Sequence, residues 1–463
     1  MVADARQIAQ EASTLKAAGR FEQAVALYRQ VVLLSPKSAA AEHNLAAALG
    51  DAGHWREAEL HIRSAFTKGI DAPESWLVLA RCLLTMARPQ EAEGAFRQAL
   101  ARRSNFYDAH RELAQLRWMM SGDIGAAIAN LDRAIEAAPR DPQLLVIKAH
   151  ALEHAGDLEG AWALLAALAA ACPQDAAVLN AAAQTATAVG ADAEALDLAE
   201  RASLQSPGEP VVAITLVTAQ LAAGQTDVAS RLVAQVRQWA PHNQHAIALQ
   251  ATAWRLLGDA RYRKLYNYDA FVAAAQIDTP RGWPDSASYQ AELTQCLSAA
   301  HGFHTHPFGQ SIRHGTQVSD VLQREEPALR ALSEALDGPI RRYIAALGPG
   351  DDPLRSRNNG LYAYQGMWSI RMSAGGFHID HVHPKGWLSA ACYVQTPERR
   401  EGEEGCIRFG QPGVRTTPHL DAEHFVDPEP GKLVLFPSYM WHGTVPYADP
   451  SPRMTIAFDL APG

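Results

Sequence analysis

The chain has 463 residues, of which 48% are hydrophobic and 20% are charged. This length exceeds that of one ordinary domain, so we expect two or more domains. The formal net charge of −9 argues against nucleic acid as a partner, because phosphate contacts need a basic face and no long run of Lys or Arg occurs.

Cysteine usage and the N-terminal residues predict a cytoplasmic protein. The five cysteines are scattered, odd in number and never spaced as Cys-x-x-Cys, which fits reduced thiols. The first residues lack a basic segment followed by an apolar core, so we expect no signal peptide. No run of about 18 apolar residues occurs, so we expect no membrane span. The cysteines are Cys82, Cys172, Cys296, Cys392 and Cys406.

The N-terminal half repeats a glycine that is followed five residues later by an alanine. Successive glycines from Gly122 to Gly224 are 34 residues apart, and Ala87 takes the place of the glycine in the third unit. Glycine permits a tight turn between two helices, the small alanine lets them pack closely, and a proline ends most units. The glycine and alanine pairs are Gly19/Ala24, Gly53/Ala58, Gly122/Ala127, Gly156/Ala161, Gly190/Ala195 and Gly224/Ala229.

This pattern resembles the tetratricopeptide (TPR) repeat. It predicts an all-α superhelix of about seven repeats over residues 1–265. We expect the concave surface of such an array to bind a protein or peptide. Self-association and support of the second domain are the alternatives.

Residues 266–285 are rich in turn formers and are predicted to be a linker. A helical lead-in is expected over 286–350, with one helix over 287–301 and a second over 319–347 that breaks at Gly338-Pro339. The polar segment 306–317 has neither helical nor strand periodicity. It is expected to be a surface loop or a wall of the active site.

Short β-prone runs separated by Gly and Pro follow over 360–463 and predict a jelly-roll domain. Such a barrel has a mouth in which loops and strand ends can hold a metal. The expected strands are Met367–Met372, Trp387–Gln395, Cys406–Phe409, Lys432–Phe436 and Met454–Leu460.

Three histidines and one aspartate lie between positions 378 and 383 and offer two possible pairs of metal ligands. Residues two apart on a strand point to the same side, so His378/Asp380 and His381/His383 have opposite parity and cannot both face inward. A carboxylate would offset part of the charge of a divalent cation, which favours the His378/Asp380 pair. His442 follows a strand and an aromatic turn and is predicted to be the third ligand with either pair.

Several segments of residues 280–463 match the pattern of one family. They are His306-Pro307, Gln310-Ser311, Gly315-Thr316-Gln317, Trp368-Ser369-Ile370-Arg371, Gly375-Gly376-Phe377-His378, His381-Val382-His383-Pro384, Gly386-Trp387-Leu388-Ser389, Tyr393-Val394 and Leu433–His442. The segments resemble a bacterial family of 2-oxoglutarate/Fe(II)-dependent oxygenases that is often found behind TPR repeats. Its His-x-His-Pro pattern favours the His381/His383 pair.

The resemblance implies Fe(II), 2-oxoglutarate and O₂ as cofactor and co-substrates. Arg453 would bind the far carboxylate of 2-oxoglutarate, since the guanidinium suits bidentate contacts, and Thr455 on the same face could add a hydroxyl. Further candidates for the co-substrate pocket are Ser389 and Tyr393. Further candidates for the substrate pocket are Arg371, Gln310, Arg313 and Trp441.

The predicted protein is therefore multidomain, with an all-α TPR superhelix followed by a double-stranded β-helix (jelly-roll) domain with flanking helices over 286–463. The preferred function is an Fe(II)/2-oxoglutarate-dependent dioxygenase that hydroxylates a peptide or protein presented by the repeats, an arrangement similar to that of aspartyl/asparaginyl β-hydroxylases. A small-molecule hydroxylase and a non-catalytic TPR adaptor with a degenerate barrel are the alternatives.

Overall fold

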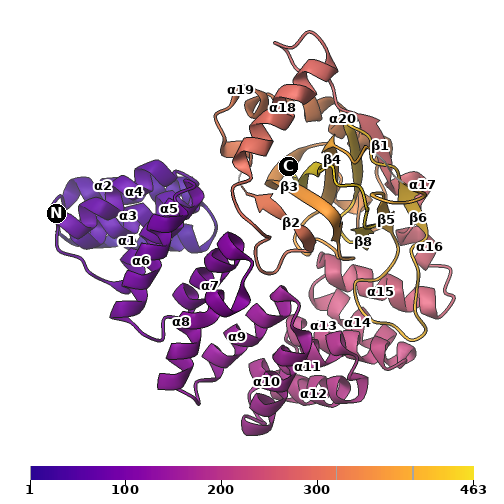
Figure 1. The fold of residues 1–463 in the computed structure, drawn as a ribbon, viewed down its shortest axis with the longest axis horizontal. Coiled ribbons are helices and arrows are strands. Elements are labelled where there is room, and N and C mark those ends of the chain that lie inside the picture. Colours follow the sequence, from indigo (N-terminus) through magenta and orange to yellow (C-terminus); the bar gives the residue numbers. More distant parts are fainter. Residues whose placement is uncertain (1, 320, 399–400) are drawn as a thin grey trace. The chain divides into compact units, whose positions relative to one another are not determined.

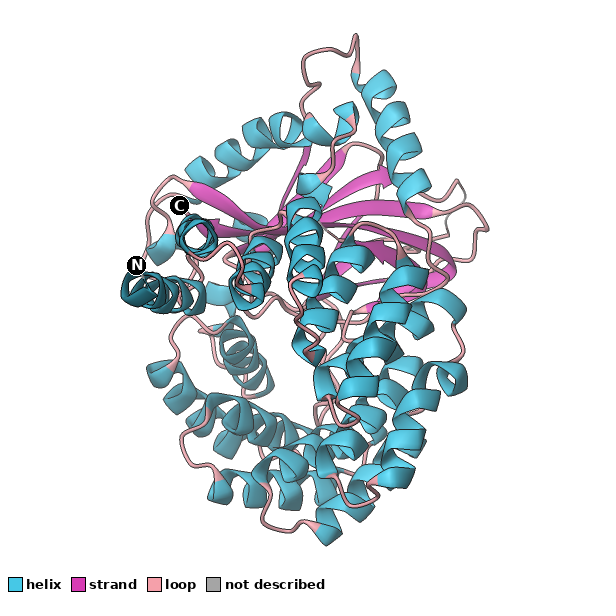
Figure 2. Ribbon diagram, turned by 90° about the vertical axis from the view of Figure 1, so that its left-hand side faces the viewer, coloured by secondary structure: helices cyan, strands magenta, loops and turns pink. Residues whose placement is uncertain are grey.

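The computed structural model describes residues 2–319, 321–398 and 401–463. The chain forms two compact units, Met1–Ala151 and Leu152–Gly463. The first unit is built of repeat helices, and the second holds further repeat helices and all the strands (Figures 1 and 2). No helix among the described residues combines the length and the apolar character needed to cross a membrane.

Paired antiparallel helices fill the N-terminal part, as the repeat pattern predicts. The predicted turn glycines all have positive φ, from 69° to 94°, a conformation open to glycine at little cost. Ala87 adopts the same conformation, with φ of 56°. The helices are α1 (Val2–Ala17), α2 (Phe21–Leu34), α3 (Ala39–Asp51), α4 (Trp55–Thr67), α5 (Pro73–Thr85), α6 (Pro89–Arg102), α7 (Tyr107–Ser121), α8 (Ile124–Ala137), α9 (Pro142–Ala155), α10 (Leu158–Ala171), α11 (Ala176–Val189), α12 (Asp192–Gln205), α13 (Pro210–Ala222), α14 (Thr226–Trp239) and α15 (Gln244–Leu256).

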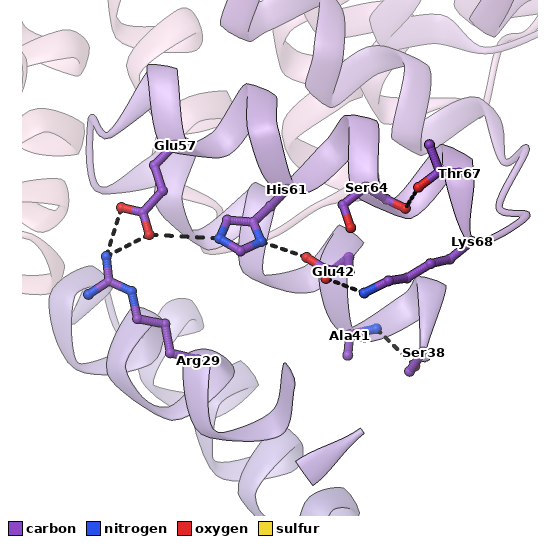
Figure 3. A network of polar contacts seen from close by, with 9 residues as sticks. All are labelled: Arg29, Ser38, Ala41, Glu42, Glu57, His61, Ser64, Thr67 and Lys68. Atoms are coloured by element: carbon purple, nitrogen blue, oxygen red, sulfur yellow. Dashed lines mark hydrogen bonds and ion pairs between the residues drawn. The ribbon is translucent and has the colours of Figure 1, made fainter. Parts of the chain in front are cut away.

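A buried carboxylate joins α3 to α4 in the first unit (Figure 3). Glu42 is only 5% exposed, and it accepts hydrogen bonds from Lys68 and from Nδ1 of His61, at 2.5 Å. The other ring nitrogen of His61, Nε2, lies 3.8 Å from a carboxylate oxygen of Glu57. Glu57 also forms an ion pair with Arg29 of α2, at 2.7 Å. Burial alone would raise the pKa of Glu42, but the hydrogen bonds from Lys68 and His61 outweigh it and hold that pKa below its ordinary value of 4.5.

The segment predicted to be a linker contains ordered structure in the second unit. Two short helices, α16 (Tyr262–Leu265) and α17 (Tyr268–Phe271), lead into strand β1 (Ala273–Gln276). This strand pairs antiparallel with β7 (Lys432–Pro437) at one edge of the larger sheet. Residues 273–276 therefore belong to the C-terminal fold.

The following segment contains α18 (Ser286–Ala300), β2 (Ile312–Val318), η1 (Val321–Gln323), α19 (Pro327–Arg330), α20 (Leu332–Leu347) and η2 (Arg355–Arg357). Two expectations for it were wrong. The polar run at 312–318 is a strand, because it pairs with β3 although its side chains lack the alternation of a buried strand. Helix α20 continues through Pro339. Proline has no N–H and cannot donate to the carbonyl of Ala335, four residues earlier. That carbonyl accepts a hydrogen bond from the backbone N–H of Asp278 at 2.9 Å instead.

The remaining strands are β3 (Tyr362–His378), β4 (Leu388–Gln395), β5 (Ile407–Phe409), β6 (His424–Val426), β8 (His442–Thr444) and β9 (Arg453–Pro462). They form two antiparallel sheets, with strand orders β1-β7-β4-β9-β3-β2 and β6-β5-β8. The predicted strands and the expected jelly-roll type of fold are confirmed.

One hydrophobic core runs from the last repeats into the sheets. It includes Val217 and Leu249 of the repeats, Tyr266 of the short segment after α16, and Phe436 and Phe458 of the larger sheet. In Figure 1, α15 and α16 lie beside β5, β6 and β8. The last repeats and the C-terminal fold are thus one packing unit.

Candidate metal centre

Three histidines come together at the short strand β8. A ring nitrogen from each of His381, His383 and His442 lies within 4.8 Å of the others, and we call this group the histidine trio. His381 and His442 form an isolated antiparallel bridge, in which each backbone N–H donates to the other residue's carbonyl at 2.9 and 3.1 Å. Backbone pairing therefore fixes two of the three rings relative to each other.

Each ring of the trio is oriented by a hydrogen bond at Nδ1. The acceptors are the carbonyl of Ile379 for His381 (2.8 Å), a carboxylate oxygen of Asp459 for His383 (2.8 Å) and the carbonyl of Met440 for His442 (2.9 Å). None of these oxygens carries a hydrogen, so Nδ1 donates in every case. A neutral ring then keeps Nε2 unprotonated and able to bind a cation.

Burial keeps the rings of His381 and His442 neutral. It lowers the pKa of the His442 imidazole well below its usual value, and nearby His381 acts in the same direction. Burial, and then the neighbouring His383, lowers the pKa of His381 to about 3. Neutral imidazole is the form that ligates metals, so the donor set fits a divalent metal ion.

The competing His378/Asp380 pair is not part of the trio. Asp380 forms a bidentate ion pair with Arg408 of β5, at 3.0 Å to Nε and 2.6 Å to Nη2. His378 ends β3, and its Nδ1 lies 2.9 Å from the hydroxyl of Ser311. Of this pair only Asp380 is directed away from the trio, to Arg408 of the smaller sheet, whereas His378 lines the same cavity as the trio. The expected opposite parity therefore does not hold for His378.

A cavity of about 660 Å³ opens beside the trio, a typical size for a small-molecule site. Of the residues predicted to contact substrates, Gln310, Arg313, Arg453 and Thr455 line it. The rest of its wall includes His154, Ser311, Gln317, Trp368, His378, Lys385, Ala391, Ala457 and Asp459. His154 belongs to helix α9, so a repeat helix contributes to the wall.

Strand β9 provides a row of side chains to this cavity. Arg453, Thr455, Ala457 and Asp459 alternate with buried core residues and all line the cavity. Arg453 is 2% exposed and its guanidinium lies 5.2 Å above the ring of Tyr393. Among the described residues, neither Arg453 Nε nor the Tyr393 hydroxyl has a hydrogen-bond partner.

A buried cation without a carboxylate is energetically costly. The wall at Arg453 therefore fits an anionic ligand, and a dicarboxylate co-substrate would pair with its guanidinium. Tyr393, whose ring lies under that guanidinium, is not among the residues that line the cavity.

Ser389 lies behind the trio rather than in the cavity wall. Its hydroxyl donates to Asp459 at 2.7 Å, and Asp459 in turn accepts the Nδ1 hydrogen of His383. The predicted co-substrate contact of Ser389 is replaced by a chain of hydrogen bonds that orients a ring of the trio.

Arg371 also lies outside the cavity wall. Ile370 lies opposite Thr455 in the β3–β9 ladder, so both side chains are on the cavity side of the sheet. Arg371 is the next residue of β3 and therefore points to the opposite side. Trp441 is buried against a repeat helix, where its Nε1 donates to Thr252 Oγ1 at 2.9 Å and its ring meets His245 edge-on at 5.5 Å. Neither Arg371 nor Trp441 is among the residues that line the cavity.

The turn before His442 is held by the end of the repeat array. Tyr266, after α16, donates its hydroxyl hydrogen to the carbonyl of Tyr439 at 3.1 Å and accepts from the backbone N–H of Trp441 at 3.0 Å. The hydroxyl of Tyr439 donates to the carbonyl of Leu265 at 3.1 Å. Since Met440 orients His442 from within this turn, the repeats indirectly position a member of the trio.

Two residues of the site were not singled out from the sequence. Asp459 could have been found by parity, because it continues the alternation of Arg453 and Thr455 along β9. Ser311, whose hydroxyl lies 2.9 Å from His378 and 3.2 Å from His381 Nε2, precedes a strand that the sequence did not predict. Its one sequence signal was the match of Gln310-Ser311 to the oxygenase family, which gave it no role.

Comparison with known families agrees with this arrangement. Residues 366–459 match the family described as "Putative 2OG-Fe(II) oxygenase". Residues 119–176 and 187–253 match two tetratricopeptide repeat families. The chain thus combines tetratricopeptide repeats with a C-terminal domain of this oxygenase family.

Solved structures similar to the chain are TPR proteins. One is a tetratricopeptide repeat protein from Parabacteroides merdae, at 14% identity, with 54% of this chain and 98% of that chain covered and a TM-score of 0.39. Another is the C-terminal part of a TPR repeat-containing protein from Cytophaga hutchinsonii, at 15% identity, 52% and 98% coverage and a TM-score of 0.36. No curated protein matches the chain.

Proposed function

We propose that this protein is an Fe(II)/2-oxoglutarate-dependent dioxygenase that hydroxylates its substrate. One observation carries the proposal: the histidine trio and a buried, unpaired arginine, Arg453, line the same cavity. A metal site alone would fit many proteins. A metal site beside an orphaned cation fits a metal enzyme with an anionic co-substrate.

His381, His383 and His442 would hold the iron through their Nε2 atoms. Three ligands from one side of a metal leave positions open for co-substrates. The bound iron supplies the activation of O₂, by which one oxygen atom enters a substrate C–H bond as hydroxyl and the other enters 2-oxoglutarate, which leaves as succinate and CO₂. The protein's part is to bind, orient and shield the reactants.

Arg453 would bind the far carboxylate of 2-oxoglutarate, with Thr455 as a neighbouring hydroxyl donor. Both side chains are buried, so little water competes for the carboxylate. Bidentate pairing with a guanidinium then gives a strong and oriented contact.

The repeats would bring a peptide or protein to this cavity. Two observations support this part: repeat arrays expose extended binding surfaces, and His154 of α9 is in the cavity wall. We place the protein in the cytoplasm, because none of its five cysteines forms a disulfide in the described structure.

The test is an anaerobic titration with Fe(II) and then 2-oxoglutarate, followed by visible absorption. The bound pair should give a metal-to-ligand charge-transfer band, and a well-folded protein without this band would disprove the proposal. Arg453→Gln should raise the 2-oxoglutarate concentration needed for half of the band by about 30-fold or more, the effect of removing one partner of a buried charge pair. Its iron content should stay near that of the wild type.

A further inference from the structure

Arg313 is a second buried cation of the cavity, separate from Arg453. It lies at the start of β2, opposite Phe377 in the β2–β3 ladder, and lines the cavity. Burial lowers the pKa of its guanidinium. The group nevertheless remains charged at neutral pH, because arginine loses its proton only far above that range.

The guanidinium of Arg313 is held by its own segment. Nη1 donates to the carbonyls of Gln310 at 2.9 Å and Ile312 at 2.8 Å. The fork formed by Nε and Nη2 makes no hydrogen bond that involves another described residue. This is the edge of a guanidinium that pairs with a carboxylate in a bidentate manner.

The backbone next to Arg313 is strained. His314 has φ of 52°, and the ladder to β3 is interrupted here. The hydroxyl of Ser373 donates to the carbonyl of His314 at 3.0 Å and helps to hold this conformation. Strain of this kind in a non-glycine residue is found mostly at functional sites, and interrupted ladders re-aim side chains.

The charges of the cavity wall do not balance. Among the described residues it contains the cations Arg313, Lys385 and Arg453 but only one carboxylate, Asp459. That carboxylate is occupied by His383 and Ser389. A divalent metal and doubly charged 2-oxoglutarate would cancel each other, and one arginine would serve the far carboxylate of 2-oxoglutarate. A positive charge at Arg313 is then left for the substrate.

We propose that Arg313 binds a carboxylate of the substrate through its Nε and Nη2 edge. The substrate is therefore an acid: a peptide with an Asp or Glu side chain, or a free carboxylic acid of similar size. This inference rests on the proposed dioxygenase function and adds the class of substrate to it.

The experiment measures succinate formed from 2-oxoglutarate above the level without substrate, using the full-length protein loaded with Fe(II). One peptide pool has Asp or Glu at a fixed central position, a matched pool has Asn or Gln there, and N-acetylaspartate represents small free acids. The acidic pool or N-acetylaspartate should stimulate succinate formation at least about 10-fold more than the amide pool, since an unpaired amide loses the charge-assisted contact. Which of the two acidic probes acts identifies a peptide or a small-molecule substrate.

Arg313→Gln should reduce this stimulation by about 30-fold or more and leave the anaerobic charge-transfer band with 2-oxoglutarate unchanged. Arg330→Gln is the matched control, because it removes an exposed arginine of α19 that does not line the cavity. It should behave as the wild type.

Three outcomes overturn the inference. They are equal stimulation by acidic and amide pools, no stimulation by any acidic probe, and loss of the charge-transfer band in Arg313→Gln, which would assign Arg313 to the co-substrate. Failure of the proposed dioxygenase function is recognised separately, because the wild-type band is measured before any probe is added.

Discussion

The two predicted ligand pairs differ in where their single side chains are directed. Nδ1 of His381 donates to a backbone carbonyl and Nδ1 of His383 donates to the carboxylate of Asp459. Asp380, in contrast, forms an ion pair with Arg408. Both carboxylate oxygens of Asp380 already accept hydrogen bonds from the guanidinium of Arg408, so they are not free to bind a metal.

We therefore expect His381→Ala to abolish stoichiometric Fe(II) binding and His378→Ala to retain it. The physical reason is that three ligands are needed on one side of the metal and His378 is not one of the trio. Metal content after anaerobic loading and desalting is the measurement. Retained iron in His381→Ala together with lost iron in His378→Ala would reverse the assignment.

A second residue-scale prediction concerns Ala87. Its φ of 56° places a Cβ where the other repeats have glycine, which costs about 1–2 kcal/mol. Glycine gains more freedom on unfolding, so Ala87→Gly should stabilise this turn by a net amount of about 0.5–1 kcal/mol. Hydrogen exchange of α5 and α6 in the full chain should slow accordingly. Faster exchange there would show that the conformation is not strained.

The residue-scale features differ in how far the sequence predicts them. His442 and Arg453 were expected because each stands beside a strand with a clear apolar pattern. Spacing alone could not decide between the His378/Asp380 and His381/His383 pairs. It shows which residues share a side of the strand, but not which side faces the cavity until the strand pairing is known. The roles of Ser389 and Asp459 depend on β4 and β9 being neighbours, a contact between distant segments that periodicity does not encode.

At the scale of elements, the turn before β8 is the link between the repeats and the site. Thr252 of α15 accepts the indole hydrogen of Trp441, the residue before His442. Thr252→Val keeps the volume but leaves that buried donor unsatisfied, at a cost of about 1–3 kcal/mol. We expect about 10-fold weaker Fe(II) binding, the usual effect of disturbing groups that orient a ligand.

Thr252→Ser restores the hydroxyl and should restore the iron affinity, which distinguishes orientation from simple packing. The measurement is Fe(II) titration under anaerobic conditions. An unchanged affinity for Fe(II) in Thr252→Val would show that this contact from the repeats does not help to orient the metal ligands.

The network around Glu42 predicts a pH dependence in α3 and α4. Its folded-state pKa lies below 4.5, so its stabilisation is present above the unfolded pKa and is lost as the pH falls through the folded pKa. Glu42→Gln leaves Lys68 and His61 without their carboxylate and should destabilise these helices by about 2 kcal/mol at pH 7. The difference from the wild type should shrink below about pH 4.

Hydrogen exchange of α3 and α4 at several pH values tests this expectation. Glu57→Gln is the matched control, because the Glu57 side chain is 38% exposed and exposed pairs contribute little. Equal effects of the two substitutions would contradict a special role of the buried carboxylate.

The apolar pattern predicted the elements well where apolar side chains are buried, as in the repeat helices and in β4, β7 and β9. It failed at β2, whose pairing with β3 rather than its own pattern makes it a strand. It failed again at α20, where the proline rule was overridden by Asp278, a partner from a distant part of the chain. Both errors arise from contacts made only in the folded state.

On the scale of the whole molecule, the compact units do not coincide with the predicted domains. The division at Ala151 and Leu152 lies within helix α9, whereas the sequence suggested a linker at 266–285. The glycine and prolines of that segment lie at positions 280–284, between β1 and α18, whereas residues 268–276 form α17 and the edge strand β1.

A fragment of residues 142–463 should fold and give the charge-transfer band, whereas a fragment of residues 286–463 should not. The shorter fragment lacks β1 and the apolar residues of α13–α17 that complete the core, and exposed apolar surface of this kind leads to aggregation. Near-ultraviolet circular dichroism and anaerobic titration of both fragments are the measurements. A stable 286–463 fragment with the band would show that the repeats are dispensable.

The hydrogen bonds between Tyr266, Tyr439 and Trp441 have a consequence for how such a protein can change its length. Repeat arrays gain and lose whole modules readily because each module contacts only its neighbours. Deleting a 34-residue module before Leu152 leaves every contact around the histidine trio in place. Deleting one between α13 and α15 would remove or rotate the helix on which the turn rests. The array is therefore free to be lengthened, shortened or exchanged at its N-terminal end only, and its last modules are inherited together with the C-terminal fold.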